Sequence, residues 1–119
     1  MYRNRKKTVN AVVYSTNTGK LQVSAWDVEC LHREEGINGF GCHYLILQNG
    51  DVESHTTLET LRQREAMGNV DPMYNHNSIF IQVVGSDGNY TEAQKASVRA
   101  LTDHLETTTG AMPLYLTDI

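Results

Sequence analysis

The feature that most constrains the fold is a dense apolar run, SIFIQVV, at residues 78–84. The run does not alternate between apolar and polar residues, so a strand formed here is buried on both faces. Such a strand lies inside a sheet whose two faces are covered, usually by helices. The run therefore predicts an α/β fold with this strand at the centre of the sheet.

Other patterns complete the expected sheet. Residues 8–14 are rich in β-branched side chains and predict a first strand, and residues 112–116 predict a last one. Asn49-Gly50 separates strand patterns at 42–48 and 51–55. Asn and Gly tolerate the positive φ angles of a type I′ turn, so this pair predicts a hairpin. The expected sheet is mixed and has about five strands.

Helix boundaries are marked by capping patterns. Thr91 and Gln94 have the spacing of a capping box, and Gly110 is a natural helix stop. A similar pattern predicts a helix over residues 24–35, and a shorter helix is expected over residues 58–67. The chain is therefore expected to be α/β, with helices packed against a mixed sheet.

Charge divides the chain into two parts. The first seven residues include Arg3, Arg5, Lys6 and Lys7 and no acid, while the remaining 112 residues carry six Lys or Arg against fourteen Asp or Glu, a net charge of −8. An acidic body argues against a general nucleic-acid binder. We expect one domain over residues 1–119, with residues 1–7 as a flexible basic arm.

Cellular location is indicated by what the sequence lacks. The apolar runs are too short to span a bilayer, so no membrane partner is expected, and no apolar segment follows the charged start as in a secretion signal. Cys30 and Cys42 form no CxxC motif and have no His at a metal-ligand spacing. These observations predict reduced thiols and a cytoplasmic protein.

Three ordered stretches resemble the zinc-dependent N-acetylmuramoyl-L-alanine amidases, a family that includes phage lysozyme-type amidases and animal peptidoglycan recognition proteins. They are LHREEGINGFGCHYLILQNGDVES (31–54), YNHNSIFIQVVG (74–85) and NYTEAQKASVRALTDHL (89–105). The resemblance implies the family's fold. It also implies cleavage of the amide between the lactyl group of muramic acid and L-alanine, by a zinc held by two His and one Cys or Asp.

The sequence departs from the family at every zinc position that can be matched. Tyr14 stands where the first zinc His ends the first strand, and a phenol remains protonated at neutral pH. Leu116 or Thr117 stands at the second His, and the sequence ends before the third ligand. Cys42 replaces the Tyr of the GYHF strand, and Phe80 replaces a Gly. We therefore expect no zinc, no other cofactor and no catalysis.

Thiol catalysis is an unfavourable replacement. Cys42 and His43 are adjacent on a strand pattern, so their side chains are expected on opposite faces and cannot meet. A distant His, such as His76, could still approach Cys42, but the sequence names no third group to orient it. His43 is expected to make a structural hydrogen bond, as the matching family His does. None of the five His has a partner at a metal-ligand spacing.

The fold still offers a groove above the sheet. Strand alternation puts Cys42, Tyr44 and Ile46 on one face, and the resemblance turns that face toward the groove. Neutral, amphipathic side chains there suit ligand binding, or merely seal the groove. The candidate binding residues on its floor and rim are Tyr14, Ser15, Asn17, Cys42, Tyr44, Arg62, Arg64, His76 and Thr117.

Three functions follow as hypotheses. The main expectation is a catalytically inactive, amidase-like binding module of phage or mobile-element origin. It would bind or sequester a small ligand, such as a peptidoglycan fragment or an anionic signalling molecule held by Arg62 and Arg64 or the basic arm, or a protein partner. The alternative is an active peptidoglycan-cleaving amidase. The third is a structural protein that forms a homo-oligomer, because residues 112–116 would be an exposed edge strand.

Overall fold

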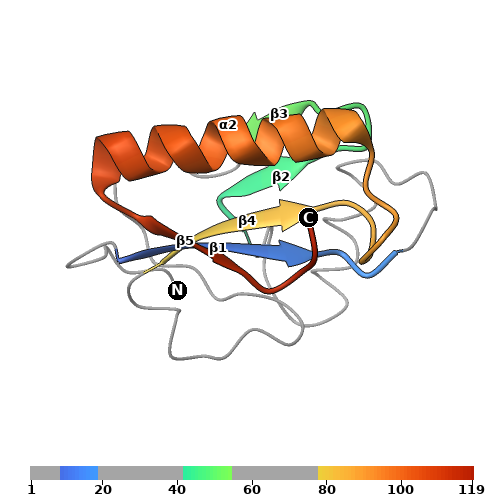
Figure 1. Ribbon diagram of the computed structural model, residues 1–119, viewed down its shortest axis with the longest axis horizontal. Helices are drawn as coiled ribbons and strands as arrows, with labels where there is room; N and C mark the ends of the chain where they lie inside the picture. The colour runs from blue at the N-terminus through green and yellow to red at the C-terminus, as the bar shows by residue number, and fades with distance from the viewer. Residues whose placement is uncertain (1–8, 19–41, 55–77) are drawn as a thin grey trace.

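The computed structural model describes residues 9–18, 42–54 and 78–119. The elements run β1 (Asn10–Ser15), β2 (Tyr44–Ile46), β3 (Val52–Ser54), β4 (Ser78–Val83), α2 (Glu92–Thr109) and β5 (Met112–Tyr115) (Figure 1). Several predictions from the sequence lie outside the described residues: the basic arm, the helices over 24–35 and 58–67, Cys30, and the candidate residues Arg62, Arg64 and His76.

The five strands form one mixed sheet in the order β3-β2-β4-β1-β5. β2, β4, β1 and β5 are parallel to one another, and β3 is antiparallel to β2. The carboxyl ends of the four parallel strands therefore meet at one edge of the sheet, on the right in Figure 1. We call this the carboxyl edge. The predicted mixed α/β sheet of about five strands is confirmed.

β4 lies at the centre of the sheet, as its apolar run predicts. All six of its residues are buried. Ile79, Ile81 and Val83 join the hydrophobic core on the side of α2, together with Ala11 and Val13 of β1. Because neighbouring residues on a strand alternate, Phe80 and Gln82 lie on the opposite face, and both are buried there too.

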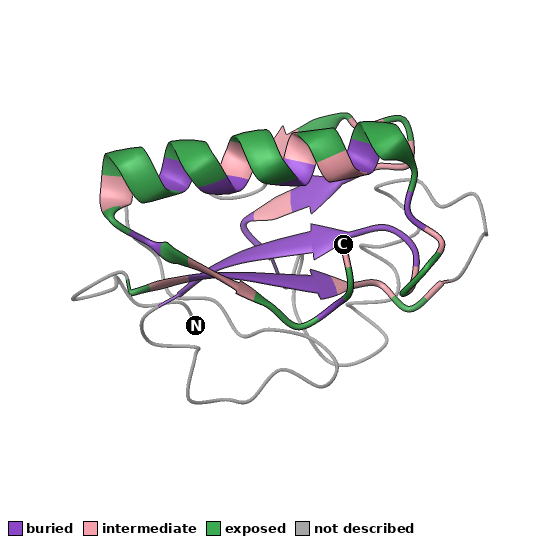
Figure 2. Ribbon diagram, viewed as in Figure 1, coloured by how far each residue is buried: buried purple, intermediate pink, exposed green. Residues whose placement is uncertain are grey.

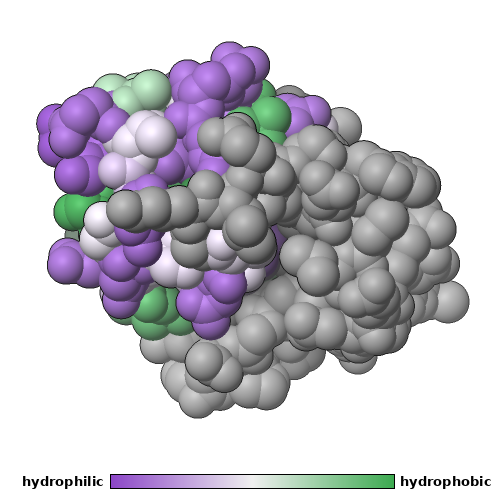
Figure 3. All heavy atoms as spheres, turned by 90° about the vertical axis from the view of Figure 1, so that its right-hand side faces the viewer, coloured by the Kyte–Doolittle hydropathy of each residue, from purple (hydrophilic) through white to green (hydrophobic). Residues whose placement is uncertain are grey.

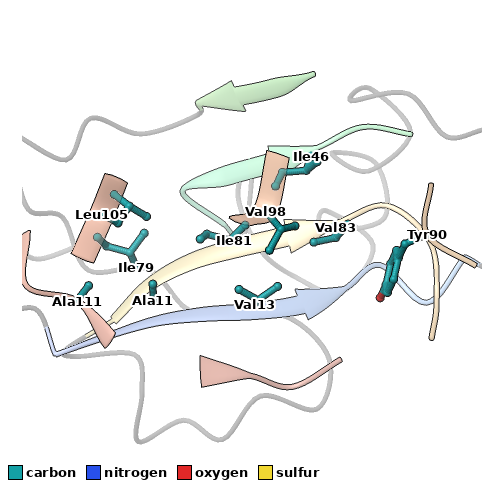
Figure 4. Packing of buried hydrophobic residues seen from close by; sticks show 10 residues of the cluster. All are labelled: Ala11, Val13, Ile46, Ile79, Ile81, Val83, Tyr90, Val98, Leu105 and Ala111. Atoms are coloured by element: carbon teal, nitrogen blue, oxygen red, sulfur yellow. The ribbon is translucent and has the colours of Figure 1, made fainter. Parts of the chain in front are cut away.

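α2 covers one face of the sheet and begins and ends as its capping residues predict. Thr91 accepts a hydrogen bond from the Gln94 amide, and the Gln94 side chain accepts one from the Thr91 amide. Gly110 has a left-handed φ of 75° and ends the helix. Val98 and Leu105 face the core (Figure 4), while the outer side of the helix is exposed (Figure 2). Within the described ranges, no helix is both long and apolar enough to cross a membrane.

The Asn49-Gly50 hairpin is confirmed, but the predicted type I′ turn is wrong. Gly50 has a φ of 91°, whereas Asn49 does not have a positive φ. The Gly50 amide donates to the Leu47 carbonyl, and the Leu47 amide donates to the Asp51 carbonyl. These bonds are typical of a three-residue loop with glycine in the left-handed position.

Candidate functional site

The carboxyl edge carries a group of polar side chains from three segments. Ser15 ends β1, Tyr90 precedes α2, and Thr117 follows β5. In open α/β sheets, ligands bind in the crevice outside the carboxyl ends of the strands. Figure 3 faces this side of the molecule, and hydrophilic side chains cover much of its described surface. The carboxyl edge is therefore the candidate functional site.

Thr117 lies at the centre of this group. Its side chain is buried, and its hydroxyl lies within hydrogen-bond distance of both the Asp87 carboxylate and the Tyr90 hydroxyl. The Asp118 amide donates to the same Asp87 oxygen at 2.9 Å. Ser15 contributes a further hydrogen bond to Tyr90. We call Asp87, Tyr90, Thr117 and Asp118 the Thr117 cluster.

The cluster changes the acidity of two of its members. Hydrogen bonds from the Thr117 hydroxyl and the Asp118 amide lower the pKa of Asp87, because they stabilise its charged form. Burial raises the pKa of Tyr90, because a phenolate is poorly solvated in the core. At neutral pH, Asp87 is thus an ionised acceptor and Tyr90 a protonated hydroxyl.

The face of the sheet opposite α2 holds an aromatic group around Phe80. The Tyr14 ring meets Phe80 edge-on with ring centroids 6.2 Å apart, and the His43 ring stacks on it at 5.9 Å. The Phe80 amide donates to His43 Nδ1 at 2.9 Å, which is the structural hydrogen bond expected of this His. Because Nδ1 is the acceptor, neutral His43 carries its proton on Nε2.

The structure divides the predicted floor residues instead of gathering them in one groove. Tyr14 is 4% exposed on the face opposite α2, while Ser15 and Thr117 lie on the side of Tyr90. Asn17 is exposed beyond the end of β1 with a φ of 60°. Cys42 is fully buried two residues before β2 begins. Whether any of these residues binds a ligand stays a prediction.

Tyr44 and Ile46 lie on the face of the sheet that α2 covers, and a role of Tyr44 in ligand binding stays a prediction. Ile46 belongs to the core beneath α2, and Tyr44 packs against that core. Tyr44 pairs in register with Ile81, which also faces α2. Strand alternation predicts which residues share a face, but the position of α2 decides which face is covered, and a single strand pattern does not contain that information.

Sequence reasoning missed Asp87 and Tyr90. Both lie between β4 and α2, in the polar sequence GSDGNY, which carries no catalytic or ligand-binding motif. A usable signal was present, because a polar turn that follows a central parallel strand must lie at the carboxyl edge. Their contact with Thr117 spans about 30 positions in the chain and has no local pattern.

A surface pocket of about 290 Å³ adjoins the cluster on the side of α2. It is lined by Val98, Arg99, Tyr115, Thr117, Asp118 and Ile119. Its wall combines a guanidinium, a phenol and a carboxylate with apolar side chains. Such a wall can contact the polar and the apolar parts of a ligand at once.

Fold and site together define a class, a mixed α/β domain with a polar site at the carboxyl edge of its parallel strands. Residues 5–115 match the N-acetylmuramoyl-L-alanine amidase family, so the chain belongs to this family. It is 34% identical over 94 residues to the endolysin of Escherichia phage T7, covering 73% of this chain and 55% of that protein. The chain therefore spans only about half the length of this relative.

Solved structures of the same fold include enzymes and recognition proteins. The N-acetylmuramoyl-L-alanine amidase LysC from Clostridium intestinale is 21% identical with a TM-score of 0.68, covering 92% of this chain and 70% of that chain. Drosophila peptidoglycan recognition protein SD is 15% identical with a TM-score of 0.74, covering 97% of this chain and 73% of that chain. At these identities the likeness shows the fold.

The expectation of a catalytically inactive binding module is contradicted. The relatives are named endolysins and amidases, which points to peptidoglycan cleavage, the alternative hypothesis. The interpretation of the chain as a non-enzyme is wrong for the same reason. Mismatches at a few matched positions show only that those particular side chains differ, and they do not establish loss of the reaction.

The described residues do not fit the zinc that the family implies. Tyr14 packs edge-on against Phe80, Leu116 is apolar, and the Thr117 hydroxyl is engaged by Asp87 and Tyr90. His43 uses Nδ1 to accept from Phe80, so its remaining nitrogen is a donor. No group of three His, Cys, Asp or Glu residues close enough to hold a metal occurs in the described ranges.

Proposed function

We propose that this chain acts as an N-acetylmuramoyl-L-alanine amidase on peptidoglycan. The observation that carries the proposal is the family match over residues 5–115, and the T7 endolysin supports it at 34% identity. The reaction consumes one water molecule and breaks the amide between the lactyl group and L-alanine. It leaves a free carboxylate on the sugar and a free amino group on the peptide.

We further propose that the glycopeptide binds at the carboxyl edge. Family relatives named peptidoglycan recognition proteins support a peptidoglycan fragment as the ligand. The exposed Asn17 and the half-buried Ser15 offer neutral hydrogen-bonding groups of the kind that bind sugar hydroxyls and peptide amides. Because the described residues do not fit zinc, no step of the proposal is assigned to a metal.

The proposal is tested by digesting purified cell walls with the purified chain. Amidase cleavage releases new amino-terminal alanine without new reducing sugar ends, so both are measured over time. The heat-denatured chain serves as the blank. New reducing ends would indicate a glycosidase instead, and no new alanine termini above the blank would contradict the proposal.

A substitution of Asn17 tests whether the glycopeptide binds at the carboxyl edge. The φ of 60° at Asn17 suits glycine, so Asn17→Gly removes the carboxamide without straining the backbone. We expect a KM for soluble peptidoglycan that is several-fold higher, with an unchanged melting temperature. The control is Glu106→Gln, on the exposed last turn of α2. Equal KM values for the two variants would place the substrate elsewhere.

An oligomeric assembly stays a prediction that no observation in the described residues favours. β5 is the edge strand, and Met112, Tyr115 and Leu116 are partly exposed. The backbone amides of Met112 and Leu116 donate toward β1. The backbone nitrogens of Pro113 and Tyr115 therefore face the open edge of the sheet. Pro113 has no amide hydrogen, which makes this edge a poor template for another strand.

A further inference from the structure

The hydrogen-bond directions in the Thr117 cluster follow from its chemistry. An ionised carboxylate only accepts hydrogen bonds, so the Thr117 hydroxyl donates its single proton to Asp87. The bond between Tyr90 and Thr117 must then have Tyr90 as the donor. The result is one directed chain from the Tyr90 hydroxyl through Thr117 to Asp87.

This chain joins two segments that are far apart in the sequence, the loop between β4 and α2 and the segment after β5. Asp87 belongs to the turn after β4, Tyr90 to the entry of α2, and Thr117 to the segment after β5. The Asp118 amide adds a second link between the last segment and Asp87 at 2.9 Å. Tyr90 is buried and forms part of the hydrophobic core (Figure 4). The packing of its ring therefore holds the network in place.

We infer that the Thr117 cluster fixes the segment after β5 at the carboxyl edge without a metal, at a position where the family resemblance places a zinc ligand. The Thr117 hydroxyl donates to a carboxylate and accepts from a tyrosine, so its hydrogen-bonding capacity is satisfied without a cation. The cluster thus provides by hydrogen bonds the anchoring that a metal ligand would provide. The inference concerns how the site is held and does not depend on the proposed function.

The first test measures zinc and stability in the purified full chain. We expect well below one zinc ion per chain by elemental analysis, and a melting temperature that neither zinc nor a chelator changes, because a structural metal couples binding to folding. Stoichiometric zinc that survives dialysis, with a melting temperature that falls on chelation, would overturn the inference. Peptidoglycan cleavage is read out separately, so each proposal can fail alone.

The second test removes the central hydroxyl. Thr117→Val removes the hydroxyl that joins Asp87 to Tyr90, and we expect the melting temperature to fall by about 3–6 °C. Thr117→Ser keeps the hydroxyl and should recover most of the loss. Thr107→Val, which removes an exposed hydroxyl from α2, is the matched control. Equal melting temperatures for Thr117→Val and the wild type would contradict the inference.

A local readout separates this anchoring from a general loss of stability. Amide hydrogen exchange at Asp118 reports on its bond to Asp87. Asp87→Ala should speed this exchange at least several-fold while amides of β4 remain protected. An unchanged exchange rate at Asp118, or acceleration spread evenly over the sheet, would show that the cluster does not anchor the segment.

Discussion

Gly50 shows how one residue links the hairpin to the helix. Its φ is 91°, and a Cβ added there would lie 3.0 Å from both the Cβ and the carbonyl oxygen of Ala93 in α2. A left-handed backbone disfavours any side chain at this position, and an added Cβ would also crowd Ala93 of α2. The glycine therefore serves both the turn and the contact between the hairpin and α2.

Two glycine variants separate these effects. Gly88 has a φ of 79°, and an added Cβ there would meet nothing within 4 Å, so Gly88→Ala should cost only about 1–2 kcal/mol of unfolding free energy. Gly50→Ala should cost about 1–3 kcal/mol more, because it also crowds Ala93. Urea denaturation of both variants measures the difference. Equal losses would mean that the hairpin does not press on α2.

Asp87 makes the unfolding free energy depend on pH. Its pKa is lowered in the folded chain, so the stabilisation is present above the unfolded value of 3.8 and is lost as pH falls through the folded pKa. Urea denaturation between pH 6 and acid should therefore show a steeper loss in the wild type than in Asp87→Asn. Asp103→Asn, on the exposed side of α2, is the control. Parallel profiles for Asp87→Asn and the wild type would refute this role.

At the scale of elements, Gln94 connects α2 to the sheet. Its side-chain oxygen accepts from the Thr91 amide at 2.9 Å, and its side-chain nitrogen donates to the Val84 carbonyl at 2.7 Å. Gln94 is fully buried. The capping box was predicted from sequence spacing, but the bond to Val84 required the packing of the helix over β4.

A substitution of Gln94 distinguishes its two bonds. Gln94→Glu keeps an acceptor for the Thr91 amide but loses the donor to Val84 and buries a carboxylate. We expect a loss of about 2 kcal/mol or more in unfolding free energy, because buried charged groups without full partners are costly. Chemical denaturation at neutral pH measures it, with Glu92→Gln as the exposed control. A loss no larger than that of the control would mean that Gln94 stabilises the fold only through its bond to the Thr91 amide.

At the scale of the whole molecule, local patterns predicted the elements well and the site poorly. SIFIQVV, the Asn49-Gly50 pair and the Thr91 capping box each act within a few residues, so the central strand, the hairpin and α2 could be predicted. The turn type was wrong because α2 packs on the hairpin, where Thr91 and Ser97 donate to the carbonyls of Gln48 and Gly50.

The candidate site depends on contacts between distant segments. The family resemblance marks Thr117 by its matched position, yet its partners Asp87 and Tyr90 cannot be predicted without the sheet order. Tyr14 and Ser15 are adjacent in sequence but lie on opposite faces of the sheet. The family, by contrast, was predicted from three motifs between residues 31 and 105, and the match over residues 5–115 confirms it.

The central claim is that this chain hydrolyses the lactyl–alanine amide, and a defined substrate tests it most directly. A purified muramoyl peptide is incubated with the chain in water enriched in heavy oxygen, and the products are separated and weighed by mass spectrometry. We predict a free peptide with amino-terminal L-alanine and a lactyl carboxylate that carries one heavy oxygen atom. An intact substrate after prolonged incubation with folded protein would contradict the account.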